Sequence, residues 1–73
     1  MSERAAARKV LEENMRGGVL ADDAPLDSLG IDSLRFLIVV LAIEQAVGRS
    51  VYQLSELAKV KTVGDLLAPL EED

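Results

Sequence analysis

An apolar run from Phe36 to Ile43 is the feature that most limits what this chain can fold into. The run is continuous and rich in β-branched residues, so its composition suits a buried strand as well as a helix. Asp32 and Ser33 before it are good N-cap residues, helix formers follow it, and Gly48 supplies a stop. A segment of about 15 residues is ordinary for a helix and long for a strand. We therefore predict a helix over residues 33–47.

Three further segments also predict helices. The stretch "ERAAARKVLEENMR" follows a capping Ser2 and is expected to end at Gly17–Gly18. A short helix is expected within residues 50–60, where Ser55 is a candidate cap, and the last one begins at Thr62, with Asp65 completing a capping box. Apolar residues at helical spacing predict the inward-facing positions of these helices: Ala7, Val10 or Leu11, Met15, Val51, Leu54, Leu57, Val60, Leu66, Leu67 and Leu70.

The segment from residue 17 to about residue 31 is rich in turn residues and is predicted to be a loop. A loop of this length is unusual in a small domain unless it is functional or pinned to the core. Five apolar residues are the expected pins: Val19, Leu20, Leu26, Leu29 and Ile31. The prediction is thus an all-α fold, a small three- to four-helix bundle with a long loop between its first two helices, forming a single domain over residues 1–73.

Composition excludes several functions. The 73 residues include no Cys and no His, so the chain lacks the usual nucleophile, general base and metal ligands, and we expect neither a catalytic residue nor a metal site. A formal charge of −5, from 13 acidic and 8 basic residues, argues against nucleic-acid binding. The apolar run is too short to span a membrane and no signal peptide is visible, so a cytoplasmic location is expected. We also expect a monomer.

Ser33 is the one side chain whose position suggests chemistry. It opens the predicted apolar helix, where four backbone N–H groups lack partners and the helix dipole is positive. A phosphate ester on this hydroxyl would meet N–H donors and a favourable field. The alternative is an ordinary helix cap, which residue types alone favour. No His, Cys or Ser-x-x-Lys pattern supports an activated serine nucleophile.

Two blocks of sequence resemble a known family. Residues 29–34, "LGIDSL", look like the phosphopantetheine attachment motif of carrier proteins, Leu-Gly-x-Asp-Ser-Leu. Residues 62–65, "TVGD", resemble the start of the last helix in acyl carrier proteins. The spacing between the blocks, the long loop and the chain length also fit, so the resemblance covers essentially the whole chain.

The resemblance implies a carrier rather than an enzyme. A phosphopantetheinyl transferase would attach 4′-phosphopantetheine from coenzyme A to Ser33, and the thiol of this arm would hold cargo as a thioester. By the same resemblance, Asp32 and Leu34 would help the transferase to recognise the site. Further partners would be enzymes that load and process acyl groups.

The helix after the motif departs from the family pattern. Arg35, Phe36 and Ile38 stand where the family usually has acidic or polar residues, and Val51–Tyr52 replaces its usual Ile-Pro. The expected buried stripe does not easily accommodate both Phe36 and Ile38, which are either covered by the loop or exposed to a partner. We predict that Arg35, Phe36 and Ile38 lie at or near a partner-facing surface. The residues expected to fill the buried stripe are Leu34, Leu37, Val40 or Leu41, and Ala42–Ile43.

These departures favour an acyl carrier of polyketide or other specialised biosynthesis over one of general fatty-acid synthesis. We expect it to be free-standing, because Met1 opens the first helix and the chain ends just after the last. One alternative is a peptidyl or aminoacyl carrier of nonribosomal peptide biosynthesis. An alternative from another class is a small helical interaction module in which Ser33 is only a cap.

Overall fold

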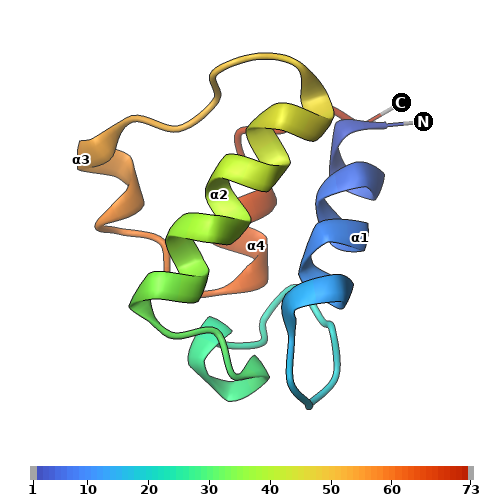
Figure 1. Ribbon diagram of the computed structural model, residues 1–73, viewed down its shortest axis with the longest axis vertical. Coiled ribbons are helices and arrows are strands. Elements are labelled where there is room, and N and C mark those ends of the chain that lie inside the picture. The colour runs from blue at the N-terminus through green and yellow to red at the C-terminus, as the bar shows by residue number, and fades with distance from the viewer. Residues whose placement is uncertain (1, 73) are drawn as a thin grey trace.

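The computed structural model describes residues 2–72, so Met1 and Asp73, the ends of the expected domain, lie outside the described residues. Within residues 2–72 the regular structure is helical, and an isolated β-bridge joins Pro25 to Thr62. The α2 helix crosses the middle of the molecule beside α1, with α4 behind it and α3 at the opposite edge (Figure 1). The predicted small all-α bundle is confirmed. Its elements are α1 (Glu3–Asn14), the 3-10 helix η1 (Leu26–Leu29), α2 (Ser33–Val47), α3 (Leu54–Leu57) and α4 (Val63–Leu67).

The α1 helix begins where the sequence predicts and ends earlier. Ser2 caps its first turn through its side chain, as expected. The last helical residue is Asn14, so the prediction that the helix continues to Gly17–Gly18 is wrong. The chain leaves the helix here because the backbone N–H of Arg16 donates to the carbonyl of Leu29 at 2.8 Å. This bond turns the chain towards η1 before the glycines are reached.

The long loop is fixed to the segment around the start of α4 by backbone hydrogen bonds. Val63 N–H donates to the Ala24 carbonyl at 3.0 Å, and Gly64 N–H donates to the Asp22 carbonyl at 2.7 Å. Position 64 requires glycine, because a Cβ there would lie 2.9 Å from the Asp22 carbonyl oxygen. The loop is therefore an ordered part of the fold, and its backbone needs this close approach.

Most of the predicted pins are confirmed. Leu26, Leu29 and Ile31 are buried, and Leu20 packs partly buried against the core. Val19 is 78 % exposed, so its prediction as a pin is wrong. The loop contains a helical turn, η1, that the sequence reading missed, and this turn carries two of the buried side chains inward.

The α2 helix has the predicted bounds, 33–47, and ends as expected at Gly48 with a positive φ of 75°. Its buried face differs from the predicted one, because Val39, Val40 and Ile43 are buried while Leu34, Leu37 and Leu41 are exposed. Apolar residues occur all around this helix, so their spacing cannot identify which side faces the core. The expected burial of Leu34 and Leu37 is wrong for this reason. Val40 and Ile43 are correctly predicted.

The α3 helix is shorter than the sequence suggests and contributes no fully buried side chain. Its predicted inward residue Leu54 is 84 % exposed, which corrects that prediction, whereas Leu57 packs partly buried against the core. Gln53, and not Ser55, occupies the N-cap position, and it makes no side-chain capping bond. Since α3 lacks both a cap bond and a buried anchor, the chain before and after it must hold it in place.

The connection from α2 to α3 has such an anchor. One carboxylate oxygen of Glu44 accepts hydrogen bonds from the backbone N–H of Val51 at 2.8 Å and of Tyr52 at 3.1 Å. These two bonds hold the pKa of Glu44 below its ordinary value, because they favour the charged carboxylate. The Tyr52 hydroxyl donates to the Leu66 carbonyl at 2.6 Å, which ties the same segment to α4.

The α4 helix follows the prediction closely. Thr62 and Asp65 form the predicted capping box, with the Asp65 N–H donating to Thr62 Oγ1 and the Thr62 N–H donating to Asp65 Oδ2, each at 3.2 Å. The helix ends two residues before Pro69, as expected. The predicted inward residues are all buried, namely Leu66, Leu67 and Leu70.

Candidate functional site

The turn before α2 is built by η1 and Gly30. Gly30 follows η1 with a φ of +78°, a backbone conformation that favours glycine. A Cβ at Gly30 would also lie 2.8 Å from the Cβ of Arg16, so the space is closed as well. Ile31 is buried next to this turn and fixes its position on the core. The first four residues of the motif thus set where α2 begins.

Asp32 caps α2. Its Oδ1 atom accepts a hydrogen bond from the backbone N–H of Arg35 at 2.8 Å, which satisfies one of the unpaired donors of the first turn. Ser33 is the first helical residue and is exposed. The alternative in which Ser33 itself caps the helix is therefore wrong. Asp32 caps the helix, so capping does not require the Ser33 hydroxyl.

The first turn of α2 suits a phosphate ester on Ser33. The backbone N–H groups of Ser33 and Leu34 precede the first possible intrahelical donor and have no partner within the helix. The 15-residue helix adds a partial positive charge at this end. Donors and field together would stabilise a phosphodiester at the hydroxyl, as helix starts commonly do for phosphate groups.

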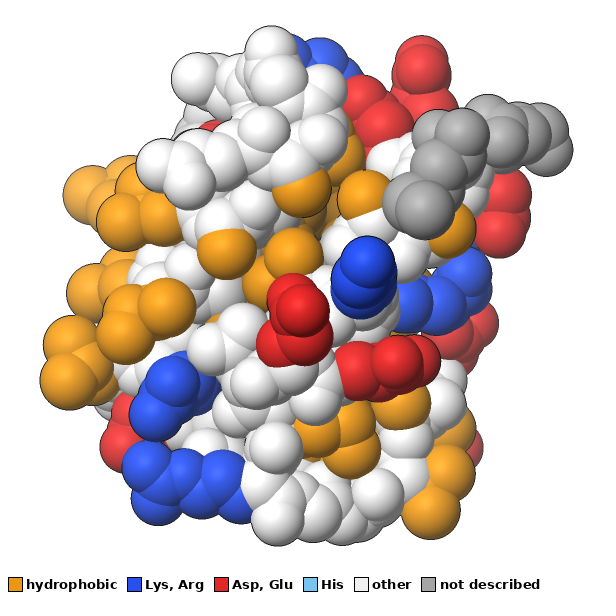
Figure 2. All heavy atoms as spheres, turned by 45° about the vertical axis from the view of Figure 1, so that its right-hand side comes forward, with side chains coloured by type: hydrophobic (Ala, Val, Ile, Leu, Met, Phe, Trp, Pro, Cys, Tyr) orange, Lys and Arg blue, Asp and Glu red, His pale blue; other side chains and the backbone are white. Residues whose placement is uncertain are grey.

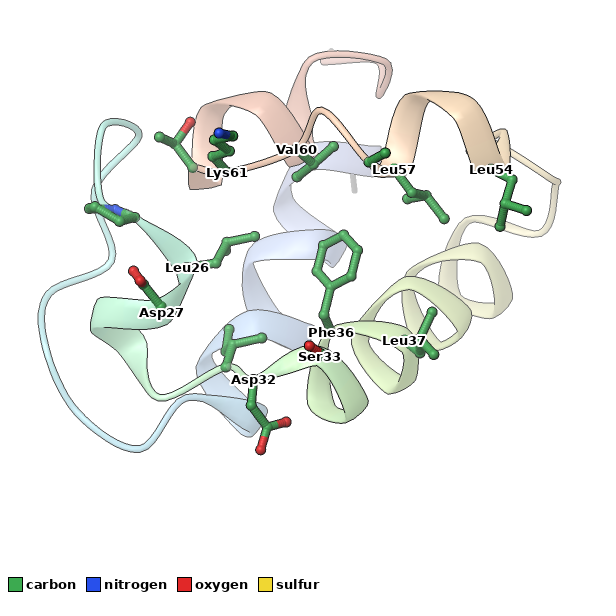
Figure 3. Close-up of a pocket in the computed structure, with 14 residues that line it drawn as sticks. Leu26, Asp27, Asp32, Ser33, Phe36, Leu37, Leu54, Leu57, Val60 and Lys61 are labelled. Carbon is green, nitrogen blue, oxygen red and sulfur yellow. The ribbon is translucent and has the colours of Figure 1, made fainter.

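A groove of about 780 Å³ opens beside Ser33 between α2 and α3. Figure 3 shows Phe36 projecting from α2 into it, towards the residues of α3 and of the segment that follows, while Asp32 points away. Because most of its lining is apolar, this groove can hold an apolar group linked to the hydroxyl at its edge. Its apolar lining includes Leu26, Phe36, Leu37, Leu54, Leu57 and Val60.

The three residues predicted at a partner surface lie in different surroundings. Ile38 is 44 % exposed. Phe36 is partly buried and packs against the core at the groove. Arg35 is half-buried, and its guanidinium lies 3.4 Å from the side-chain oxygen of Asn14 on α1. The structure therefore places Ile38 and Phe36 on separate sides of α2, one outward and one at the groove.

Sequence reasoning missed the outward apolar residues beside Ile38. Leu34, Leu37 and Leu41 are exposed on the same helix, and Figure 2 shows hydrophobic side chains protruding along one edge of the molecule. The number of large apolar residues could have indicated this exposure, because the helix has more of them than one buried stripe can hold. Which of them are exposed depends on how α2 is rotated against α1 and the core.

Within residues 2–72 no three His, Cys, Asp or Glu side chains group to hold a metal ion. None of the helices in that range is long and apolar enough to cross a membrane.

Comparison with known proteins agrees with the geometry around Ser33. The family model described as the phosphopantetheine attachment site matches residues 4–69. No curated protein and no solved structure matches the chain. The match runs from the second residue of α1 to just beyond the end of α4 and includes the turn, the cap and the groove described above. The chain belongs to the phosphopantetheine attachment family and is a carrier whose family holds 4′-phosphopantetheine covalently.

Proposed function

We propose that Ser33 is the attachment residue and that the protein carries acyl intermediates as thioesters on the resulting arm. The observation that carries the proposal is the position of Ser33 within the family match: an exposed hydroxyl at the start of α2, beside an apolar groove. The capping bond made by Asp32 supports it, because the hydroxyl of Ser33 is not required to start the helix.

The reaction at this site is phosphopantetheinyl transfer. The Ser33 oxygen forms a phosphodiester bond with the phosphopantetheinyl group of coenzyme A, the pyrophosphate bond breaks, and the nucleotide part leaves with its phosphate. The hydroxyl proton passes to the transferase. The chain contributes position, because α2 holds the oxygen at a positive helix end, and the transferase contributes the catalytic groups. We propose that Asp32 and Leu34 help the transferase to recognise Ser33.

The cargo is proposed to be an acyl group of polyketide or other specialised biosynthesis. Arg35, Phe36 and Ile38 support this, since they give α2 a character unlike the acidic helix expected of a general fatty-acid carrier. We propose that they lie at or near the surface that partner enzymes read, with Phe36 acting from the groove and Ile38 from the outward face. Loading and processing enzymes are the partners that such a carrier needs.

Peptide mapping tests the attachment residue. The protein is incubated with coenzyme A, magnesium and several transferases, and digested after Arg16 and Arg35 to release a peptide with two serines, Ser28 and Ser33. Fragmentation of this peptide should place the modification on Ser33. Ser28 serves as the internal control because it is also exposed. Unlike a free hydroxyl, its side chain donates a hydrogen bond to the Pro25 carbonyl at 2.6 Å. A modification on Ser28, or on a serine outside this peptide, would show that the assignment is wrong.

A loading assay tests the cargo. The modified protein is offered to acyl-activating and to aminoacyl-activating enzymes, and its thioesters are identified by mass. Acyl loading is the expected result. Selective aminoacyl loading would overturn the acyl assignment in favour of a peptidyl carrier and leave the Ser33 assignment intact.

A further inference from the structure

Tyr52 makes two hydrogen bonds that connect the segment before α3 to two other helices. Its backbone N–H donates to a carboxylate oxygen of Glu44 on α2 at 3.1 Å, and its hydroxyl donates to the Leu66 carbonyl on α4 at 2.6 Å. A proline, the residue that the family pattern has at this position, could make neither bond, because it lacks a backbone N–H and a hydroxyl. Tyr52 therefore gives this chain an attachment of its own at the start of α3.

The bond to α4 joins the segment to the core of the protein. Leu66 is the next-to-last residue of α4, so its carbonyl is one of the last four, which have no partner within the helix. The Leu66 side chain is fully buried, and Tyr52 is partly buried against the same core. The Tyr52 hydroxyl thus satisfies a helix end and holds the start of α3 on the core.

The α3 helix itself is weakly anchored. Its four residues, Leu54–Leu57, include no buried side chain, and its N-cap residue makes no capping bond with its side chain. Beyond the helix, the Lys61 carbonyl accepts the Leu26 N–H at 2.9 Å, and the Lys61 N–H donates to Asp65 Oδ2 at 3.1 Å. The position of α3 is therefore set by Tyr52 on one side and by Lys61 on the other.

One side of the groove beside Ser33 consists of this helix and the segment after it. Leu54 and Leu57 of α3 line the groove together with Val60. Figure 3 shows these three side chains on one side of the groove and Phe36, from α2, on the other. Because α2 is long and packs along α1, the width of the groove depends mainly on where α3 is held.

We infer that Tyr52 is a positioning residue that fixes the α3 side of the groove and thereby limits the length of the acyl group that the groove can shelter. This inference rests on the proposed function, because the acyl group would reach the groove on an arm attached to Ser33, which lines it. The occupant is an apolar acyl group, since most of the lining is apolar. Each methylene that leaves water stabilises the folded protein until the groove is full, and longer groups then leave their ends in water.

The test measures the unfolding midpoint of the protein carrying a butanoyl, octanoyl or dodecanoyl group, relative to the same protein carrying the bare arm. One of several transferases installs each group from the matching acyl-coenzyme A, and intact mass confirms the product. For the wild type, we expect the midpoint to rise up to octanoyl and to change by less than about 2 °C from octanoyl to dodecanoyl. Each comparison is made within one variant, so a general loss of stability cancels.

Tyr52→Phe removes the hydroxyl bond to Leu66 and keeps the ring and the backbone N–H. We expect its midpoint to continue to rise from octanoyl to dodecanoyl, by at least about 4 °C, because α3 can then move outward and admit the longer group.

Ser2→Ala is the matched control for stability. Ser2 Oγ accepts the Ala5 N–H at 3.0 Å at the start of α1, so this variant loses a helix cap and should unfold about 4–8 °C lower than the wild type. Its midpoint should still level off between octanoyl and dodecanoyl, as in the wild type. A merely structural role for Tyr52 would make Tyr52→Phe behave in the same way as Ser2→Ala.

Hydrogen exchange tests the attachment in the wild type, without any substitution. The N–H groups of Val51 and Tyr52 both donate to Glu44 at the start of the connection to α3. If this segment stays fixed, dodecanoyl should leave their exchange rates within about twofold of the rates with the bare arm. An acceleration of more than about tenfold would show that the segment opens for the longer group, and it would overturn the inference even if Tyr52→Phe did not fold.

The remaining outcomes separate this inference from the proposed function. The inference is overturned if the wild type and Tyr52→Phe level off at the same acyl length, if the wild-type midpoint keeps rising to dodecanoyl, or if no acyl group raises it. In each of these cases Ser33 remains the attachment residue. If no transferase installs an acyl group, or if Ser33→Ala is loaded equally, the proposed function fails and takes this inference with it.

Discussion

The Oδ1 atom of Asp32 accepts a hydrogen bond from the backbone N–H of Arg35 at 2.8 Å. Asp32, the residue before the candidate attachment serine, therefore caps α2. Two adjacent polar residues thus have different tasks. Asp32 satisfies an unpaired donor of the first turn, while Ser33 remains exposed at the edge of the groove. This division allows the candidate attachment residue, Ser33, to be changed without loss of the helix start.

Substitutions at these two positions should separate stability from modification. Ser33→Ala should change the free energy of unfolding by no more than about 0.5 kcal/mol, because the residue is exposed and is not the cap. Asp32→Ala should lower it by about 1 kcal/mol through loss of the cap. Asp32→Asn keeps a capping oxygen and should remain close to the wild type. Urea unfolding measures all three, and equal losses for Ser33→Ala and Asp32→Ala would contradict the division of tasks.

Phe36 and Ile38 should respond differently to a negative charge. Phe36→Glu places a carboxylate against the core cluster and should lower the free energy of unfolding by at least about 2 kcal/mol. Ile38→Glu affects a side chain that is 44 % exposed, so it should leave the protein folded and weaken the binding of a partner enzyme. Circular dichroism during urea unfolding measures both. If Ile38→Glu unfolds the protein as readily as Phe36→Glu, the outward placement of Ile38 is wrong.

A methyl group at Gly64 should destabilise the fold by about 1–3 kcal/mol, the usual cost of overpacking. The added Cβ would lie 2.9 Å from the Asp22 carbonyl oxygen and would push the loop away from α4. Gly17→Ala is the matched control, because no atom lies within 4 Å of a Cβ at that position. The difference between the two variants in thermal unfolding measures the effect of this contact. Equal midpoints would show that the loop does not need the close approach.

The ion pair between Glu3 and Arg49 should make stability depend on acid pH. Two hydrogen bonds of 2.6 and 2.8 Å join the side chains, and a third from the Glu71 N–H helps to lower the Glu3 pKa from 4.5 to about 2. Because the folded pKa is depressed, this stabilisation is fully present above pH 4.5 and is lost as the pH falls towards about 2.

Glu3→Gln isolates this contribution, because the other carboxylates remain in both proteins. The difference in unfolding midpoint between the wild type and Glu3→Gln should be largest near neutral pH and should shrink as the pH falls from 4.5 to about 2. A difference that stays constant over this range would show that protonation of Glu3 does not weaken the fold.

Much of the fold follows from local sequence signals. The bounds of α2, the capping box of Thr62 and Asp65, and the buried leucines of α4 were all predictable, because caps and stops act over a few residues. The end of α1 was not, because it depends on a hydrogen bond from Arg16 to Leu29, a contact that forms only when the loop is folded. The helical turn η1 inside that loop was missed as well.

The candidate site also has features that the sequence predicts and features that depend on how the chain packs. The position of Ser33 at the start of α2 follows from the motif, but the choice of Asp32 as the cap depends on which of two suitable side chains reaches the Arg35 N–H. The exposed face of α2 could not be predicted, since Leu37 and Val40 are equally apolar and only the packing against neighbouring helices buries one and exposes the other.

The most direct test of the account is the intact mass of the wild type and of Ser33→Ala after incubation with coenzyme A, magnesium and the same transferase. The account predicts that the wild type gains one phosphopantetheinyl group and that Ser33→Ala, which should remain folded, gains none. A wild type that no transferase modifies, or an equal gain in Ser33→Ala, would contradict the assignment of Ser33 as the attachment residue.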